Sequence, residues 1–154
     1  MKLQKATRCA LYAVLELAAD PQRQMSASEI ADKYGISLNH LAKVLRSLGR
    51  EGLVEAVRGA GGGYRFSGNP KRTTLLDVIR LFETIDSISA GEHEPGETTP
   101  EGMALRQVLE EIEDTARATL SSITLDTMIK LIQRQRTRWV GRQAPDLALR
   151  TVGL

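Results

Sequence analysis

The sequence predicts a mainly α-helical protein with a small β-hairpin wing: a winged helix-turn-helix domain followed by a long dimerisation helix. Three observations predict this class. Two amphipathic helical patterns occupy residues 26–50, with a four-residue turn at 34–37 between them. A glycine-tipped hairpin pattern follows at residues 52–66. A long apolar helical stripe then begins near residue 103.

The first predicted helix, residues 3–19, supports this domain and carries the only cysteine of the chain. Pro21 marks its end. Free cysteines are among the most buried residue types, so one interpretation of Cys9 is a buried thiol. The alternative is a redox-reactive thiol whose pKa is lowered by Arg8, and both interpretations stay open. The apolar face of the helix comprises Leu3, Ala6, Ala10, Val14 and Leu17.

The second predicted helix opens with a capping box, in which Ser26 and Glu29 each satisfy a backbone N–H of the other. Gly35 is suited to end this helix, and Ser37 is suited to cap the next one. Ser26 and Ser28 are placed to meet DNA phosphates through hydroxyl and backbone N–H groups.

The third predicted helix has two opposite faces. Cations neutralise phosphates and an amide can hydrogen bond with a base edge, so its polar face fits the major groove of DNA. For an isolated helix, a merely solvated basic face is the alternative. The apolar stripe comprises Leu41, Val44, Leu45 and Leu48. The polar stripe comprises Asn39, Lys43, Arg46 and Arg50.

The hairpin has predicted strands at residues 52–58 and 64–66 and a glycine-rich turn at 59–63. A loop with almost no side chains can approach a nucleic-acid backbone, and Arg58 beside it can enter a minor groove. A nucleotide-binding glycine loop does not fit, because Tyr64 stands at the sixth position from Gly59 and a strand follows.

Residues 73–132 are predicted to hold the dimerisation helices. Thr74 caps the first, whose apolar stripe ends with Phe82 and Ile85. Residues 87–102 lose apolar periodicity and are expected to form an exposed, mobile acidic loop. The long helix at 103–122 carries a stripe that is expected to pack on a partner helix. Its expected dimerisation residues are Leu105, Leu109, Ile112, Ala116, Leu120 and Ile123.

The end of the chain is predicted to be a shorter helix, capped by Thr124 and running through Ile132, and then a basic, flexible tail at residues 133–154. Trp139 lies in this tail among several arginines. A frayed end is favoured over a segment that helps to hold DNA.

Charge divides the chain. Residues 1–72, the predicted DNA-binding domain, carry twelve Lys/Arg against six Asp/Glu, whereas residues 73–129 carry three against twelve. Residues 130–154 carry six against one. A basic module followed by an acidic one suggests that the first meets a polyanion.

Other classes of protein fit the sequence less well. No apolar run reaches the roughly 18 residues of a membrane span, and the charged start does not fit a signal peptide. With one cysteine, a disulfide framework is excluded, and the cytoplasm is the expected compartment. No motif joins His40 or His93 to Cys9 as base and nucleophile, so we do not expect an enzyme.

Seven short runs are distributed along the chain: 1–3 (MKL), 8–11 (RCAL), 36–45 (ISLNHLAKVL), 52–54 (GLV), 57–64 (VRGAGGGY), 76–79 (LDVI) and 124–126 (TLD). Together they resemble the Rrf-type family of bacterial regulators that includes IscR, NsrR and CymR. The resemblance covers about residues 1–132 and implies a homodimeric transcription regulator, more often a repressor, that binds a palindromic operator on double-stranded DNA.

Taken with the residue patterns, this resemblance gives a set of expected DNA contacts. The recognition helix is expected to lie in the major groove and the wing on the adjacent minor groove. The alternative is a winged-helix module that binds proteins without sequence-specific DNA binding. The expected DNA-binding residues are Ser26, Ser28, Ser37, Asn39, His40, Lys43, Arg46, Arg50, Arg58, Gly62, Gly63 and Tyr64.

The sequence departs from its cluster-carrying relatives in the acidic loop. Those relatives resemble one another in having three cysteines there, and residues 87–102 have none. Thiolates are the usual ligands of iron–sulfur clusters, so no such cofactor is expected. A hydrated loop is favoured over a site for a hard divalent ion at Glu92, His93, Glu94 and Glu97. The signal is then expected to be a regulatory partner protein, a small ligand or oxidation of Cys9.

Overall fold

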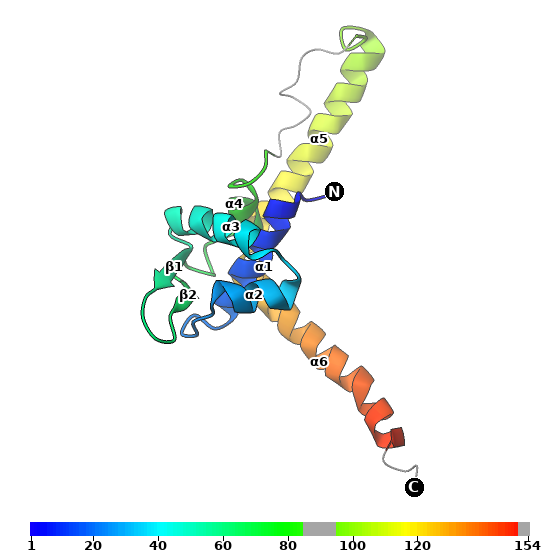
Figure 1. Cartoon of the computed structure of the whole chain (residues 1–154). Coiled ribbons are helices and arrows are strands. Elements are labelled where there is room, and N and C mark those ends of the chain that lie inside the picture. The colour runs from blue at the N-terminus through cyan, green and yellow to red at the C-terminus, as the bar shows by residue number, and fades with distance from the viewer. Residues whose placement is uncertain (85–94, 151–154) are drawn as a thin grey trace.

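A computed structural model describes the backbone of residues 1–84 and 95–150 and the side chains of these ranges as far as Gly141. It contains α1 (Lys5–Ala19), α2 (Ala27–Tyr34), α3 (Leu38–Arg50), β1 (Val54–Val57), β2 (Gly63–Phe66), α4 (Leu75–Ile79), α5 (Pro100–Ser122) and α6 (Leu125–Arg150). In Figure 1, α1 to α4 and the hairpin form one body, and α5 and α6 extend from it in opposite directions. A winged helix-turn-helix with long appended helices is therefore confirmed.

The core is built around α1, because three small or branched residues allow other helices to approach it closely. Ala10, Ala13 and Val14 have no exposed surface. They pack with Ile30 of α2 and with the apolar stripe of α3, where Leu41, Leu45 and Leu48 are fully buried. Because the core combines helices that are distant in sequence, burial of each apolar stripe fixes the position of its opposite polar face.

A carboxylate and a hydroxyl join α1 to the segment after α4. Glu83 accepts hydrogen bonds from the backbone N–H of Gln4, at 2.9 Å, and from the hydroxyl of the buried Thr7. Gln4 is the N-cap residue of α1 and makes no side-chain cap. Glu83 therefore satisfies a backbone donor that the helix itself leaves without an acceptor.

The junction between α5 and α6 is fixed to the winged domain by backbone pairing. The N–H of Leu75 donates to the carbonyl of Ile123, and the N–H of Leu125 donates to the carbonyl of Thr73, each at 2.9 Å. Ile123 has extended backbone angles, which separates the two helices. Leu125 is fully buried in the same core as α1, so the junction between α5 and α6 belongs to the core of the winged domain.

Three predicted boundaries were wrong. The helix capped by Thr74 ends at Ile79, although Phe82 still packs against the core. Helix α5 begins at Pro100 behind the cap residue Thr99, so the last three residues of the predicted acidic loop are helical. Helix α6 continues to Arg150 instead of ending near Ile132. Residues 133–140 contain neither glycine nor proline, so nothing in this stretch ends the helix.

Parts of two other predictions lie outside the described residues. Ile85, Glu92, His93 and Glu94 fall within the undescribed range 85–94. Among the residues that the structure does describe, no helix is long and apolar enough to cross a membrane.

Candidate nucleic-acid interface

The recognition helix α3 presents its predicted polar stripe to solvent. Asn39, Lys43, Arg46 and Arg50 are all exposed. The buried stripe on the opposite side carries no charge and fixes the rotation of the helix, so three cations and one amide project from the same surface. Arg50 also donates to the hydroxyl of Ser47 at 3.3 Å, which limits its freedom without neutralising its charge.

The start of α3 is capped as expected, since the hydroxyl of Ser37 accepts a hydrogen bond from the backbone N–H of His40 at 3.2 Å. The side chain of His40 is half-buried, and its Nε2 atom is shielded from solvent and has no hydrogen-bond partner among the described atoms. His40 thus lies between the core and the exposed stripe.

One exposed residue at the start of α3 was not singled out from the sequence. Leu38 is 48% exposed although it stands seven residues before the buried Leu45 and therefore shares its helical face. An exposed apolar side chain beside Asn39 is suited to contact the methyl group of thymine. In the sequence, the position of Leu38 directly after the N-cap residue Ser37 could have indicated that its side chain is exposed.

The start of α2 has the predicted capping box. The hydroxyl of Ser26 accepts from the N–H of Glu29 at 3.1 Å, and the carboxylate of Glu29 accepts from the N–H of Ser26 at 2.7 Å. The hydrogen of the Ser26 hydroxyl remains available to a phosphate. Ser28 is exposed in the first turn, where backbone N–H groups have no acceptor inside the helix.

The hairpin pairs Val54 with Phe66 and Val57 with Gly63 in antiparallel register. Arg65 forms an ion pair with Glu55 on the neighbouring strand, whereas Arg58 is exposed where β1 ends and the turn begins. Arg65 is thus held by an ion pair on the hairpin, whereas Arg58 projects into solvent beside the turn. Its position is suited to entry into a minor groove of DNA.

The two predicted wing glycines have structural reasons to be glycine. A Cβ on Gly62 would lie 2.4 Å from the carbonyl oxygen of Val57, and a Cβ on Gly63 would lie 2.4 Å from that of Met25. Met25 and Tyr64 exchange two backbone hydrogen bonds, of 2.9 and 2.7 Å. Tyr64 is half-buried against the core. The hairpin and the start of α2 consequently form one unit. Contact of Gly62, Gly63 and Tyr64 with DNA stays a prediction.

A brace holds α2 against α1. Tyr34 and Lys33 both donate to the carboxylate of Glu16, with the Lys33 Nζ at 2.8 Å from one oxygen. Tyr12 stacks on Tyr34 with ring centroids 5.0 Å apart. Burial alone would raise the pKa of Glu16, but the hydrogen bonds from Lys33 and Tyr34 outweigh it and lower that pKa.

The predicted dimerisation residues separate into two groups. Leu105 and Ile112 are 60% and 59% exposed. Leu109 and Ala116 are half-buried, and Leu120 packs against the core of its own chain. Ile123 is half-buried at the junction with α6. Sequence reasoning missed Val108, which is 53% exposed and lies one helical turn before Ile112.

Cys9 is buried, with 3% of its surface exposed, and burial raises the pKa of its thiol more than the nearby Lys5 lowers it. This environment favours a structural thiol over a reactive one.

Comparisons with known proteins agree with this geometry. Residues 3–131 match the Rrf2 family, described as iron-dependent transcriptional regulators. The chain is 54% identical over 142 residues, 90% of its own length and 87% of the relative's, to an HTH-type transcriptional regulator of Rhodopseudomonas palustris, BadM.

Two solved structures have the same fold. CymR, the global cysteine regulator of B. subtilis, matches with a TM-score of 0.71 and 28% identity over 85% of this chain and 98% of that one. IscR of T. potens matches with a TM-score of 0.67 and 27% identity over 84% of this chain and 87% of that one. An exposed recognition helix and a wing on this fold define a DNA-binding transcription regulator. The chain belongs to the Rrf2 family.

Proposed function

We propose that the protein is a homodimeric repressor that binds a palindromic operator, with α3 in the major groove and the hairpin on the adjacent minor groove. The observation that carries this proposal is the exposed stripe of Asn39, Lys43, Arg46 and Arg50 on α3. An interaction module would more often expose apolar residues on that face. The cytoplasm, where such DNA is found, is the proposed compartment.

Each side chain has a proposed role. Lys43, Arg46 and Arg50 neutralise phosphates, and Asn39 hydrogen bonds with a base edge. Ser26 and Ser28 bind a phosphate at the start of α2, and Arg58 enters the minor groove. Ser37 and His40 position the first turn of α3. Gly62, Gly63 and Tyr64 hold the wing tip near the backbone of the DNA.

Dimerisation through α5 is proposed on the exposure of Leu105, Val108 and Ile112. Replacing Leu109 and Ile112 together with glutamate should abolish the dimer, since burial of unpaired charge is costly. Helix α6 is not proposed as a DNA contact, because Figure 1 shows it running away from α3 and the hairpin.

The residues present do not fit an iron–sulfur cluster, although the family description names iron. The chain has one cysteine, which is buried and has a raised pKa. Clusters are held by several thiolates. We therefore propose a regulator without a cluster, whose signal is a partner protein or a small ligand. The burial of Cys9 makes its oxidation the weakest of the three routes.

Selection of binding sites from random DNA tests the proposed function. The expected result is a two-fold symmetric site with half-sites about one helical turn, or a multiple of it, apart. Asn39→Ala should then weaken binding by about 1 to 3 kcal/mol, mainly through one base position. Failure to enrich any sequence, together with equal loss on random DNA for Asn39→Ala, would favour the protein-interaction module.

A further inference from the structure

The first turn of α3 carries an exposed apolar residue that the proposed contacts do not use. Among residues 13–84, all of which the structure describes, Leu38 is the only large apolar side chain that is exposed. The next leucines of the same helix, Leu41, Leu45 and Leu48, have no exposed surface. Leu38 is 48% exposed and is the first residue of the helix. An exposed leucine thus stands at the end of the recognition helix that meets base edges in helix-turn-helix proteins.

The two edges of the exposed face of α3 differ in polarity. Leu38, Ala42 and Arg46 are spaced four residues apart and therefore form one row along the helix. Ala42 is half-buried and Arg46 is exposed, so this row is apolar in its first two turns and ends on a cation. On the other edge of the polar stripe, the half-buried residues are His40 and Ser47, which are both polar. The exposed face therefore has one apolar edge, at its amino-terminal end.

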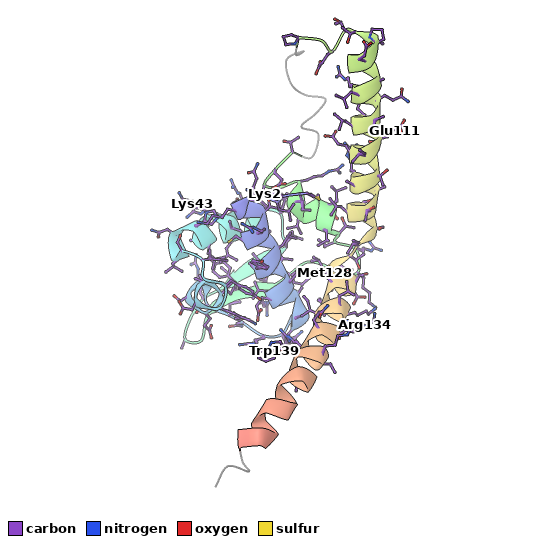
Figure 2. All side chains as sticks on the ribbon, turned by 90° about the vertical axis from the view of Figure 1, so that its right-hand side faces the viewer. Lys2, Lys43, Glu111, Met128, Arg134 and Trp139 are labelled. Atoms are coloured by element: carbon purple, nitrogen blue, oxygen red, sulfur yellow. The ribbon has the colours of Figure 1, made fainter. Side chains whose placement is uncertain are left out.

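The apolar edge is not on the side of the molecule that is proposed to dimerise. Figure 2 shows Lys43 of α3 on the side of the winged domain away from Glu111 of α5 and Arg134 of α6. Dimerisation through α5 therefore leaves the exposed face of α3 to another partner. Because the cations and the amide of this face fit DNA, we expect its apolar edge to meet DNA as well.

Double-stranded DNA offers one apolar group to such an edge. A leucine side chain neither neutralises a phosphate nor hydrogen bonds with one, so it is not suited to the contacts that the DNA backbone makes. In the major groove, the C5-methyl group of thymine is the apolar feature that base pairs present, and apolar side chains contact it. Ala42, one turn further along the row, extends the apolar surface that such a methyl group meets.

We propose that Leu38, with Ala42 beside it, reads the C5-methyl group of one thymine in each half-site of the operator. This inference rests on the proposed function and names a base feature that the major-groove contact recognises. The hydroxyl of Ser37 accepts a hydrogen bond from the N–H of His40 at 3.2 Å, which fixes the first turn that carries Leu38. Because Leu38 and Asn39 are neighbours on this turn, the thymine belongs to the base pair that Asn39 reads or to an adjacent one.

Replacing thymine by uracil in the selected operator tests the contact, because deoxyuridine lacks only the C5-methyl group and keeps the hydrogen-bonding groups of thymine. Each thymine is replaced in turn, in both half-sites together. Fluorescence anisotropy measures binding by the full-length wild type, Leu38→Ala and Met103→Ala. Leu38→Ala places a strong helix former at an exposed position, so the fold should be retained, which circular dichroism checks. Met103→Ala is the matched control, since Met103 is 62% exposed in the first turn of α5, at the end that points away from α3 in Figure 1.

At one thymine position, uracil should weaken binding by the wild type and by Met103→Ala about fourfold for each half-site, the loss expected when a methyl group is no longer buried. Leu38→Ala should bind the thymine and uracil operators equally. An operator that is bound specifically, but at which no thymine methyl group affects the wild type, would overturn this inference and leave the proposed function intact. So would a Leu38→Ala protein that keeps the full loss on uracil. A selection that enriches no sequence would overturn the proposed function, and the inference with it.

Discussion

Gly63 stands so close to Met25 that a Cβ at position 63 would lie 2.4 Å from the Met25 carbonyl oxygen. The backbone N–H of Tyr64 donates a hydrogen bond to the carbonyl of Met25, and the N–H of Met25 donates one to the carbonyl of Tyr64. The wing is consequently anchored to the residue that immediately precedes the cap of α2. One rigid unit then carries the proposed phosphate contact at Ser26 and the wing tip.

Gly63→Ala should lower the free energy of unfolding by about 1 to 3 kcal/mol, because the added methyl group forces two backbone segments apart. Gly49→Ala is the matched control, since a Cβ there meets its nearest atom at an ordinary 3.7 Å. Gly49 lies in the last turn of α3 with an ordinary helical backbone, so this change should not lower stability and should raise it by at most roughly 0.5 to 1 kcal/mol. Urea unfolding measures both, and equal effects of the two changes would contradict the close approach.

The brace at Glu16 predicts a loss of stability in acid. Its folded-state pKa is lowered from the ordinary value of 4.5, so the unfolded chain binds the proton more readily. The stabilisation is fully present above about pH 4.5 and is lost as the pH falls through the lower folded pKa. Glu16→Gln should flatten the pH dependence of unfolding in this window, whereas Glu51→Gln, at an exposed position, should not. Identical pH profiles for wild type and Glu16→Gln would contradict the claim that ionised Glu16 stabilises the fold.

Cys9 should react slowly with a thiol reagent in the folded protein and rapidly in urea, because burial shields the sulfur and raises its pKa. The time course of reaction with Ellman's reagent measures this. An oxidant should change operator binding by Cys9→Ala to the same extent as operator binding by the wild type. Fast labelling of the native protein, or an oxidant response that disappears in Cys9→Ala, would restore the redox interpretation.

Protein purified without oxygen should be colourless and contain less than stoichiometric iron and sulfide, since one buried thiol cannot replace the several thiolates of a cluster. Operator binding should be the same before and after treatment with a chelator. A brown protein with stoichiometric iron and sulfide would show that other ligands complete a site.

The helix-turn-helix was predictable from the sequence because its signals are local. The capping box at Ser26, the left-handed Gly35 and the cap at Ser37 each act within four residues, and all three are present. The exposed stripe of α3 followed from the same logic, since a strong apolar period leaves only one solvent face.

The remaining features depend on contacts between distant residues. No local sequence pattern indicates that Glu83 accepts a hydrogen bond from the start of α1. The same holds for the ion pair between Arg65 and Glu55 and for the close approach of Gly63 to Met25. The length of α6 was missed because frequent arginines made the segment look like a solvated tail. Leu120 was assigned to a partner interface, although the periodicity of one helix cannot tell whether its apolar face meets its own core.

The salt dependence of operator binding tests the central proposal most directly. The logarithm of the dissociation constant is measured against the logarithm of salt concentration for wild type, Lys43→Ala and Lys130→Ala, a matched lysine on α6. If α3 lies in the major groove, Lys43→Ala should weaken binding to all sequences and reduce the slope by about one, while Lys130→Ala changes neither. An unchanged slope for Lys43→Ala would contradict the placement of α3 against DNA.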